Sequence, residues 1–167
     1  MIALENVGTP DDPNTNVNEE KAVTVTVNGV ETLTLKAEGT NVVSLSGDSA
    51  KDISVSGNGS IKINAVPNTL KTIDASQVNG NVYVDVSNAS GMTKIVTGGG
   101  DDKVTVDISD DVLANAQIEG GSGNDELVVN GSGTVQFNQS GFEKVTFDKT
   151  TGAITFSALN AADIQTI

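Results

Sequence analysis

Short stretches of alternating apolar and polar residues recur along this chain from Val23 onward, separated by turns that contain Gly or Asn. Alternation with a period of two residues predicts β-strands with one buried face. In six places an aliphatic residue is followed eight or nine positions later by another, across such a turn. The six pairs are Leu33/Val42, Ile53/Ile61, Ile73/Val82, Ile95/Val104, Ile118/Leu127 and Val145/Ile154. Successive pairs begin 20, 20, 22, 23 and 27 residues apart, a repeat length typical of solenoids, in which each coil buries its apolar face against the next.

The spacing within each repeat favours parallel stacking over a meander of hairpins. The half of each coil between the paired aliphatic residues has a nearly constant length, whereas the return half varies from 11 to 18 residues. Stacked turns need similar lengths, while the opposite side of a solenoid can bulge. We therefore predict an all-β fold, a parallel β-solenoid of six to seven coils of 20–27 residues, with residues 33–42, 53–61, 73–82, 95–104, 118–127 and 145–154 above one another. The residues expected to face the core are Leu33, Leu35, Ile53, Val55, Ile73, Val82, Val84, Ile95, Val104, Val106, Ile118, Leu127, Val129, Val145 and Phe147.

The first part of the chain differs in composition from the rest. Residues 1–21 lack sustained alternation, contain Pro10 and Pro13, and are rich in Asn and Asp. We interpret them as a lead-in segment or linker that precedes a β-solenoid domain at 22–167. Because the apolar pattern is still running near the last residue, we expect the solenoid domain to be a fragment of a larger protein.

Composition narrows the chemistry available to the chain. It contains neither Cys nor His, which excludes disulfides, thiolate metal sites, cysteine nucleophiles and His-based zinc sites. A net charge of −13 argues against nucleic-acid binding. No run approaches the roughly 18 apolar residues of a membrane-spanning helix, so we expect no membrane insertion. Residues 98–128 hold eight acidic residues and one Lys, and that much negative charge near glycine-rich turns favours a bound cation.

Two glycine-rich turns lie within this acidic stretch. Residues 120–128 read GGSGNDELV and match every specified position of the nonapeptide G-G-x-G-x-D-x-U-x, in which U is a large aliphatic residue. One coil earlier, residues 97–105 read TGGGDDKVT, with Thr97 in place of the first Gly. Two matches in the same slot of adjacent coils are more specific than one. These turns resemble the calcium-binding β-roll repeats of the repeats-in-toxin proteins.

The resemblance implies a calcium site between the two stacked turns. Calcium prefers six to eight hard oxygen ligands, and one turn of this kind supplies about half of them. The implied ligands combine the Asp102 and Asp125 carboxylates with backbone carbonyls of residues 98–101 and 120–124. The candidate metal-binding residues are Gly98, Gly100, Asp101, Asp102, Gly120, Gly121, Gly123, Asn124 and Asp125. Because only two such turns occur, 23 residues apart, we expect one or two calcium ions.

Two further segments, residues 29–35 and 141–147, share the form G-[apolar]-E-x-[LV]-x-[LF]. They are similar to segments that lead into the coils of bacterial surface-layer proteins of the repeats-in-toxin type, and the likeness covers about residues 22–160. It implies a structural, non-enzymatic segment of a secreted, calcium-binding protein at the cell surface, exported by type I secretion. Such a protein self-associates into a lattice and attaches to the cell envelope through regions outside this chain. We expect the carboxylates of Glu31 and Glu143 to be solvated.

Two other functions stay open from the residues alone. The first is that of a repeat segment of a calcium-dependent surface adhesin. β-Solenoids also carry polysaccharide-modifying enzymes, whose sites cluster acids with Lys, Arg, His or Tyr on an exposed strand face. The best such cluster here is Tyr83 and Asp85 on one strand with Lys62 one coil away, and it lacks a plausible acid–base pair.

Overall fold

The computed structural model describes residues 1–10, 20–109, 113, 115–135, 138–150, 152–155 and 163–167, and none of these residues is helical. The first sheet consists of β1 (Ile2–Glu5), β3 (Thr32–Glu38), β5 (Asp52–Gly57), β7 (Thr72–Val78), β9 (Lys94–Val96), β11 (Gln117–Glu119) and β14 (Asn138–Ser140). The second sheet consists of β2 (Val23–Thr26), β4 (Thr40–Ser46), β6 (Ser60–Ile63), β8 (Val82–Asp85), β10 (Lys103–Asp107), β12 (Glu126–Asn130) and β15 (Lys144–Phe147). A third, two-stranded sheet pairs β13 (Gly133–Thr134) with β16 (Ile154–Thr155).

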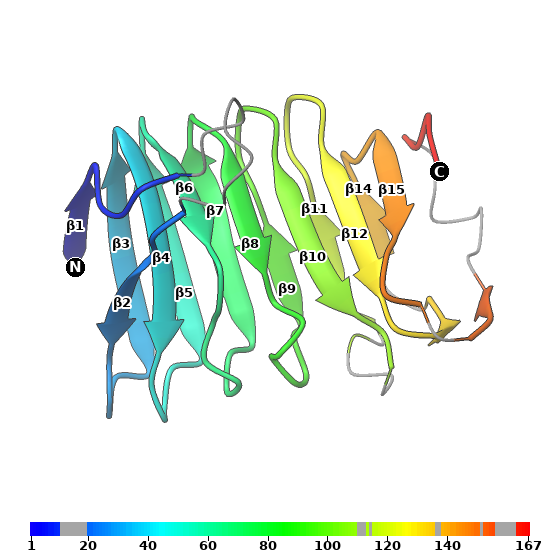
Figure 1. The fold of residues 1–167 in the computed structure, drawn as a ribbon, viewed down its shortest axis with the longest axis horizontal. Helices are drawn as coiled ribbons and strands as arrows, with labels where there is room; N and C mark the ends of the chain where they lie inside the picture. Colours follow the sequence, from blue (N-terminus) through cyan, green and yellow to red (C-terminus); the bar gives the residue numbers. More distant parts are fainter. Residues whose placement is uncertain (11–19, 110–112, 114, 136–137, 151, 156–162) are drawn as a thin grey trace.

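All pairings between neighbouring strands of these sheets are parallel. From β1 to β12 the chain alternates between the first and second sheets, so each coil adds one rung to both. Figure 1 shows the two sheets facing each other along the long axis of the molecule, with the chain advancing from its N-terminus at one end to its C-terminus at the other. These features confirm the predicted parallel β-solenoid, with about six turns.

Aliphatic side chains fill the space between the two sheets. In β3, for example, buried and exposed residues alternate along the strand, as the period-two pattern predicted. Of the residues expected to face the core, all except Phe147 are at most 4% exposed, and Phe147 is partly buried against the same cluster. Burying one such Val, Leu or Ile contributes about 1.5–3 kcal/mol, so stacked aliphatic columns account for why these coils associate. The sequence showed no apolar run as long as a membrane-spanning helix. In the described part of the chain, no helix is long and apolar enough to cross a bilayer.

The register of the stack agrees with the prediction in the first sheet and differs in the second. Leu33, Ile53, Ile73, Ile95 and Ile118 are cross-strand neighbours in that order, as expected.

In the second sheet, however, Val42 lies beside Lys62 and not beside Ile61, and Val104 lies beside Val84 and not beside Val82. The reason for the second difference is that six residues separate Val96 from Lys103, whereas eight residues separate Asp74 from Tyr83, the residues that pair with them. The position next to Val82 is therefore occupied by Asp102, whose carboxylate accepts a hydrogen bond from the Val82 amide at 2.7 Å.

The sixth predicted pair is also placed differently. Val145 does not follow Ile118 in the first sheet; it pairs with Leu127 in the second. The neighbour of Ile118 is Gln139 in β14, and Ile154 lies in the small third sheet. Because a polar residue occupies the aliphatic position of β14, the apolar pattern gave no sign of that strand.

The lead-in segment contributes to the first coil. Ile2–Glu5 forms β1, which pairs with β3 despite the absence of sustained alternation in residues 1–21. Val7 then lies beside the start of β4: its amide donates to Asn41 Oδ1 at 3.1 Å, and its carbonyl accepts from the Val42 amide at 2.6 Å. Part of this segment therefore occupies the position of a rung before β4.

Candidate metal centre

The two glycine-rich turns stack directly on each other where the chain passes from the first sheet to the second. We call residues 97–102 and 120–125 the glycine corner. The first turn joins β9 to β10 and the second joins β11 to β12, at the upper edge of the view in Figure 1. Gly99 and Ser122 form a parallel bridge, and the Ser122 amide donates to the Gly98 carbonyl at 2.9 Å. The structure therefore brings together the two turns that the sequence placed in adjacent coils.

Glycine is required in this corner by the closeness of the two backbones. Gly123 has φ +145°, and a Cβ atom built on it would lie 1.9 Å from the Gly100 carbonyl oxygen. A Cβ atom on Gly121, at φ +93°, would lie 2.2 Å from the Gly98 carbonyl oxygen. Real side chains do not tolerate such contacts, and both angles lie outside the range that L residues prefer. The nonapeptide glycines thus let one turn rest on the next.

Asp102 and Asp125 form the inner part of the corner and are each 1% exposed. Each carboxylate accepts a hydrogen bond from the main chain of the preceding coil. The Asp102 amide donates to Asp125 Oδ1 at 2.7 Å, in the same way that the Val82 amide donates to Asp102. The Asp125 amide in turn donates to Glu143 Oε2 at 2.8 Å. Together Asp102, Asp125 and Glu143 form a ladder, which we call the carboxylate ladder.

The second oxygen of each buried aspartate has no such partner. Asp102 Oδ2 and Asp125 Oδ2 are inaccessible to solvent, and no donor among the described residues lies in good hydrogen-bonding geometry to either atom. Leaving a charged oxygen buried and unpaired is costly, so such groups are normally protonated or bound to a cation. Two neighbouring coils of this protein present that situation at the same corner.

The pKa values of both aspartates are shifted by this buried environment. Burial raises the pKa of Asp102 to about 6, although the amides of Val82 and Gly98 and the Thr97 hydroxyl act in the opposite direction. The pKa of Asp125 is likewise raised to about 7, mainly by burial and also by the carboxylates of Asp102 and Glu143, against the opposing effect of the Asp102 amide. Both groups are therefore difficult to ionise without a compensating positive charge.

The other predicted side chains, Asp101 and Asn124, lie on the solvent side of the corner. Both are exposed, and the Asn124 amide donates to Asp101 Oδ1 at 2.9 Å. The Asp101 amide donates to Asn81 Oδ1 at 3.1 Å. The structure thus divides the predicted set into a buried pair, Asp102 and Asp125, and an exposed pair whose hydrogen bonds tie the same turns together from outside.

Glu143 was expected to be solvated, and it is solvated only in part. Its side chain is half-buried and extends the carboxylate ladder to a third coil. The signal for this role was its place in the slot that Asp125 fills one coil earlier. Glu31, the matching residue near the N-terminus, is exposed and pairs with Lys51 at 2.7 Å, as expected for a solvated carboxylate.

The corner offers oxygen atoms only, from carboxylates and backbone carbonyls, a donor set that suits calcium better than zinc. Within the described ranges, no group of three or more acidic side chains converges closely enough to hold a metal by side chains alone. A cation here would therefore need carbonyl oxygens of the turns as well as Asp102 and Asp125. That combination of ligands is common for calcium.

We compared the chain with protein-family models, with curated proteins and with solved structures, and none of the three searches found a match. The class of the protein is therefore given by its fold, an all-β parallel β-solenoid.

Proposed function

We propose that this chain is a calcium-stabilised structural segment of a secreted, self-assembling surface-layer protein. The observation that carries the proposal is the pair of orphaned carboxylate oxygens, Asp102 Oδ2 and Asp125 Oδ2, buried in adjacent coils at the glycine corner. The resemblance of these turns to calcium-binding repeats supports the identity of the cation.

In this proposal Asp102 and Asp125 hold calcium through their unpaired oxygens, and carbonyls of the glycine corner complete the shell. Bound calcium supplies the positive charge that lets both buried carboxylates ionise. Each aspartate keeps its other oxygen in the carboxylate ladder, so the same two side chains join three coils through hydrogen bonds. Calcium bound only by the folded chain then stabilises the stack by mass action.

The architecture supports a scaffold role. The outward positions of the first sheet are mainly Thr, Ser, Asp and Lys, as in β3 and β5. Polar faces of this kind suit repeated contacts between identical copies.

Thermal unfolding of metal-free and calcium-loaded protein tests the calcium part of the proposal. At a hundredfold excess over Kd, a cation bound only by the folded state adds about 2.7 kcal/mol, which corresponds to roughly 5–10 °C in Tm for a chain of this size. Asp125→Asn should remove most of this increase because it removes one ionised ligand while keeping an oxygen for the ladder. Asp74→Asn, on the outer face of the first sheet beside Lys94, is the control and should respond to calcium like the wild type.

Equal melting temperatures with calcium and with a chelator would show that the corner binds no calcium. Electron microscopy of the calcium-loaded protein tests assembly separately: we expect ordered sheets or stacked filaments. A protein that responds to calcium yet stays monomeric at high concentration would disprove the surface-layer part alone.

A further inference from the structure

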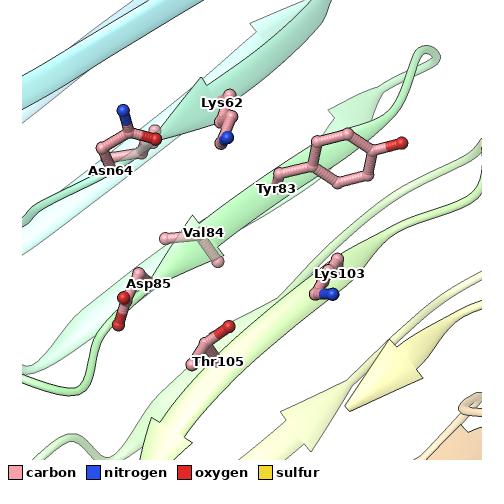
Figure 2. Close-up of a pocket in the computed structure, with 8 residues that line it drawn as sticks. Lys62, Asn64, Tyr83, Val84, Asp85, Lys103 and Thr105 are labelled. Atoms are coloured by element: carbon pink, nitrogen blue, oxygen red, sulfur yellow. The ribbon is translucent and has the colours of Figure 1, made fainter. Parts of the chain in front are cut away.

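A groove crosses the outer face of the second sheet in the middle of the solenoid. It has a volume of about 480 Å³, within the size range of ligand-binding pockets. Figure 2 shows its walls, which come from the neighbouring strands β6, β8 and β10. The lining residues are Lys62, Ile63, Asn64, Tyr83, Val84, Asp85, Lys103 and Thr105. A second hollow of about 240 Å³ shares Lys62 and Tyr83 with it, so the two meet at Tyr83.

Tyr83 is the only tyrosine of the chain, which has no Trp, and it is 39% exposed on a face of otherwise short or charged side chains. Its hydroxyl accepts a hydrogen bond from Asn81 Nδ2 at 3.3 Å. The ring is therefore held in place on the sheet. An exposed, oriented aromatic side chain offers an apolar face and a polar tip to a ligand.

The side chains around the ring form two rows across the strands. Lys62, Tyr83 and Lys103 are cross-strand neighbours, and Asn64, Asp85 and Thr105 form the next outward row (Figure 2). These groups present amide, carboxylate, hydroxyl and ammonium functions beside one aromatic ring. This combination suits a ligand that has both an apolar face and many hydroxyl groups.

The charges around the groove indicate whether its ligand is ionic or neutral. Lys62 pairs with Glu20, and Lys103 pairs with Glu126 at 2.9 Å. Because carboxylates already balance both ammonium groups, the groove has no surplus positive charge to attract an anion, and the whole chain carries −13. An uncharged ligand meets no such electrostatic cost.

We propose that this groove binds a pyranose unit of a neutral polysaccharide, with the C–H face of the sugar on the Tyr83 ring and its hydroxyls on Asn64, Asp85 and Thr105. The C–H groups of a sugar carry a slight positive charge and pack against the negative face of an aromatic ring. Two hollows that meet at Tyr83 leave room for the chain to continue past the stacked unit. This site lies apart from the glycine corner and goes beyond the proposed structural function.

The sequence provides a direct probe, because Tyr83 is the only Tyr and there is no Trp. Tyrosine fluorescence therefore reports on this groove alone. We would titrate the folded protein with dextran, mannan and galactan and follow the tyrosine fluorescence. We would also measure the mobility of the protein by affinity electrophoresis in gels that contain the same polymers, with dextran sulfate as the anionic counterpart. We expect a saturable fluorescence change and retardation with at least one neutral polymer, both in calcium and in chelator as long as circular dichroism shows the chain folded.

Variants separate ring stacking from general adhesion. Tyr83→Leu keeps an apolar side chain on the sheet but removes the ring, and should weaken binding about tenfold or more, whereas Tyr83→Phe should stay within about threefold. Lys36→Ala, on the outer face of the first sheet, is the control and should bind like the wild type. The inference is overturned by a wild-type protein that none of the neutral polymers retards, by retardation in dextran sulfate only, or by unchanged affinity in Tyr83→Leu.

Discussion

In the absence of divalent cations, the stability of this solenoid should fall as the pH rises from 5 to 8. The groups responsible are Asp102 and Asp125, whose folded pKa values of about 6 and about 7 lie above the ordinary value of 3.8. For a carboxyl with a raised folded pKa, the unfolded chain releases its proton first. The stabilisation is complete below the unfolded pKa and is lost as the pH rises through the folded pKa.

The magnitude follows from the displacement of the pKa. Each pKa unit corresponds to about 1.4 kcal/mol, so a rise from 3.8 to about 7 makes Asp125 alone account for about 4 kcal/mol over the whole range from below the unfolded pKa to above the folded pKa. About 2.5 kcal/mol of this falls between pH 5 and pH 8, because the unfolded chain already releases its proton near pH 4. The two carboxyls interact, and their contributions are not simply added. A loss of about 2.5 kcal/mol is a considerable part of the 5–15 kcal/mol that stabilises a typical domain.

Urea denaturation of metal-free protein at pH 5, 6, 7 and 8, followed by circular dichroism, measures this dependence. Asp125→Asn should flatten most of the decline, since its amide does not titrate and its oxygen still accepts from the Asp102 amide. Saturating calcium should also flatten it for the wild type, and the calcium effect should grow with pH because ionised carboxylates bind the cation. If the metal-free wild type is equally stable at pH 5 and pH 8, or more stable at pH 8, the assignment of buried, unpaired carboxyls is wrong.

Two further predictions concern the glycine corner and the Glu126 carboxylate that follows it. Gly123→Ala should destabilise the protein by about 2 kcal/mol or more, because its Cβ would meet the Gly100 carbonyl; Gly29→Ala, at φ +69° with open space around it, should cost clearly less in the same urea assay. Burial opposes ionisation of Glu126, but Lys144, Thr146 and Lys103 outweigh it and lower its pKa to about 2. Glu126→Gln should therefore remove about 1 kcal/mol at neutral pH and much less near pH 2, where about half of the wild-type carboxylates are protonated; equal losses at both pH values would contradict this account.

The sequence was sufficient to predict the solenoid and most of its core because both depend on simple periodicity. Alternation identified the strands, and the constant length of one half of each coil identified parallel stacking. The first-sheet column from Leu33 to Ile118 follows directly, since each coil has one aliphatic residue at that place. Where a coil departs from this rule, as at Gln139, the strand was missed.

The register of the second sheet could not be read from the spacing of aliphatic residues. Val82 and Val84 both face the core, so either could lie beside Val104. The choice depends on the corner, where the buried Asp102 occupies the position that the aliphatic Val82 holds in the preceding coil. An acid at a core position could not be anticipated from the apolar pattern. The sequence therefore predicted Asp102 and Asp125 as a metal pair but missed their hydrogen bonds to the main chain and the place of Glu143 beside them.

The position that carries the carboxylate ladder also shows that the acids are not needed to build the fold. Along this one column of the stack the residues are Asn41, Ile61 and Val82 in the early coils, followed by Asp102, Asp125 and Glu143 in the later ones. Ile61 and Val82 are at most 1% exposed and pack in the core cluster, so an aliphatic residue satisfies this position without any charge. Three successive acids at the same place are therefore an added feature of the later coils, in the stretch where the glycine corner lies. A column of aliphatic side chains is stable under all ionic conditions, whereas a column of buried carboxylates is stable only when protons or cations neutralise it. We therefore expect any stabilisation by calcium to arise in the later coils of the solenoid.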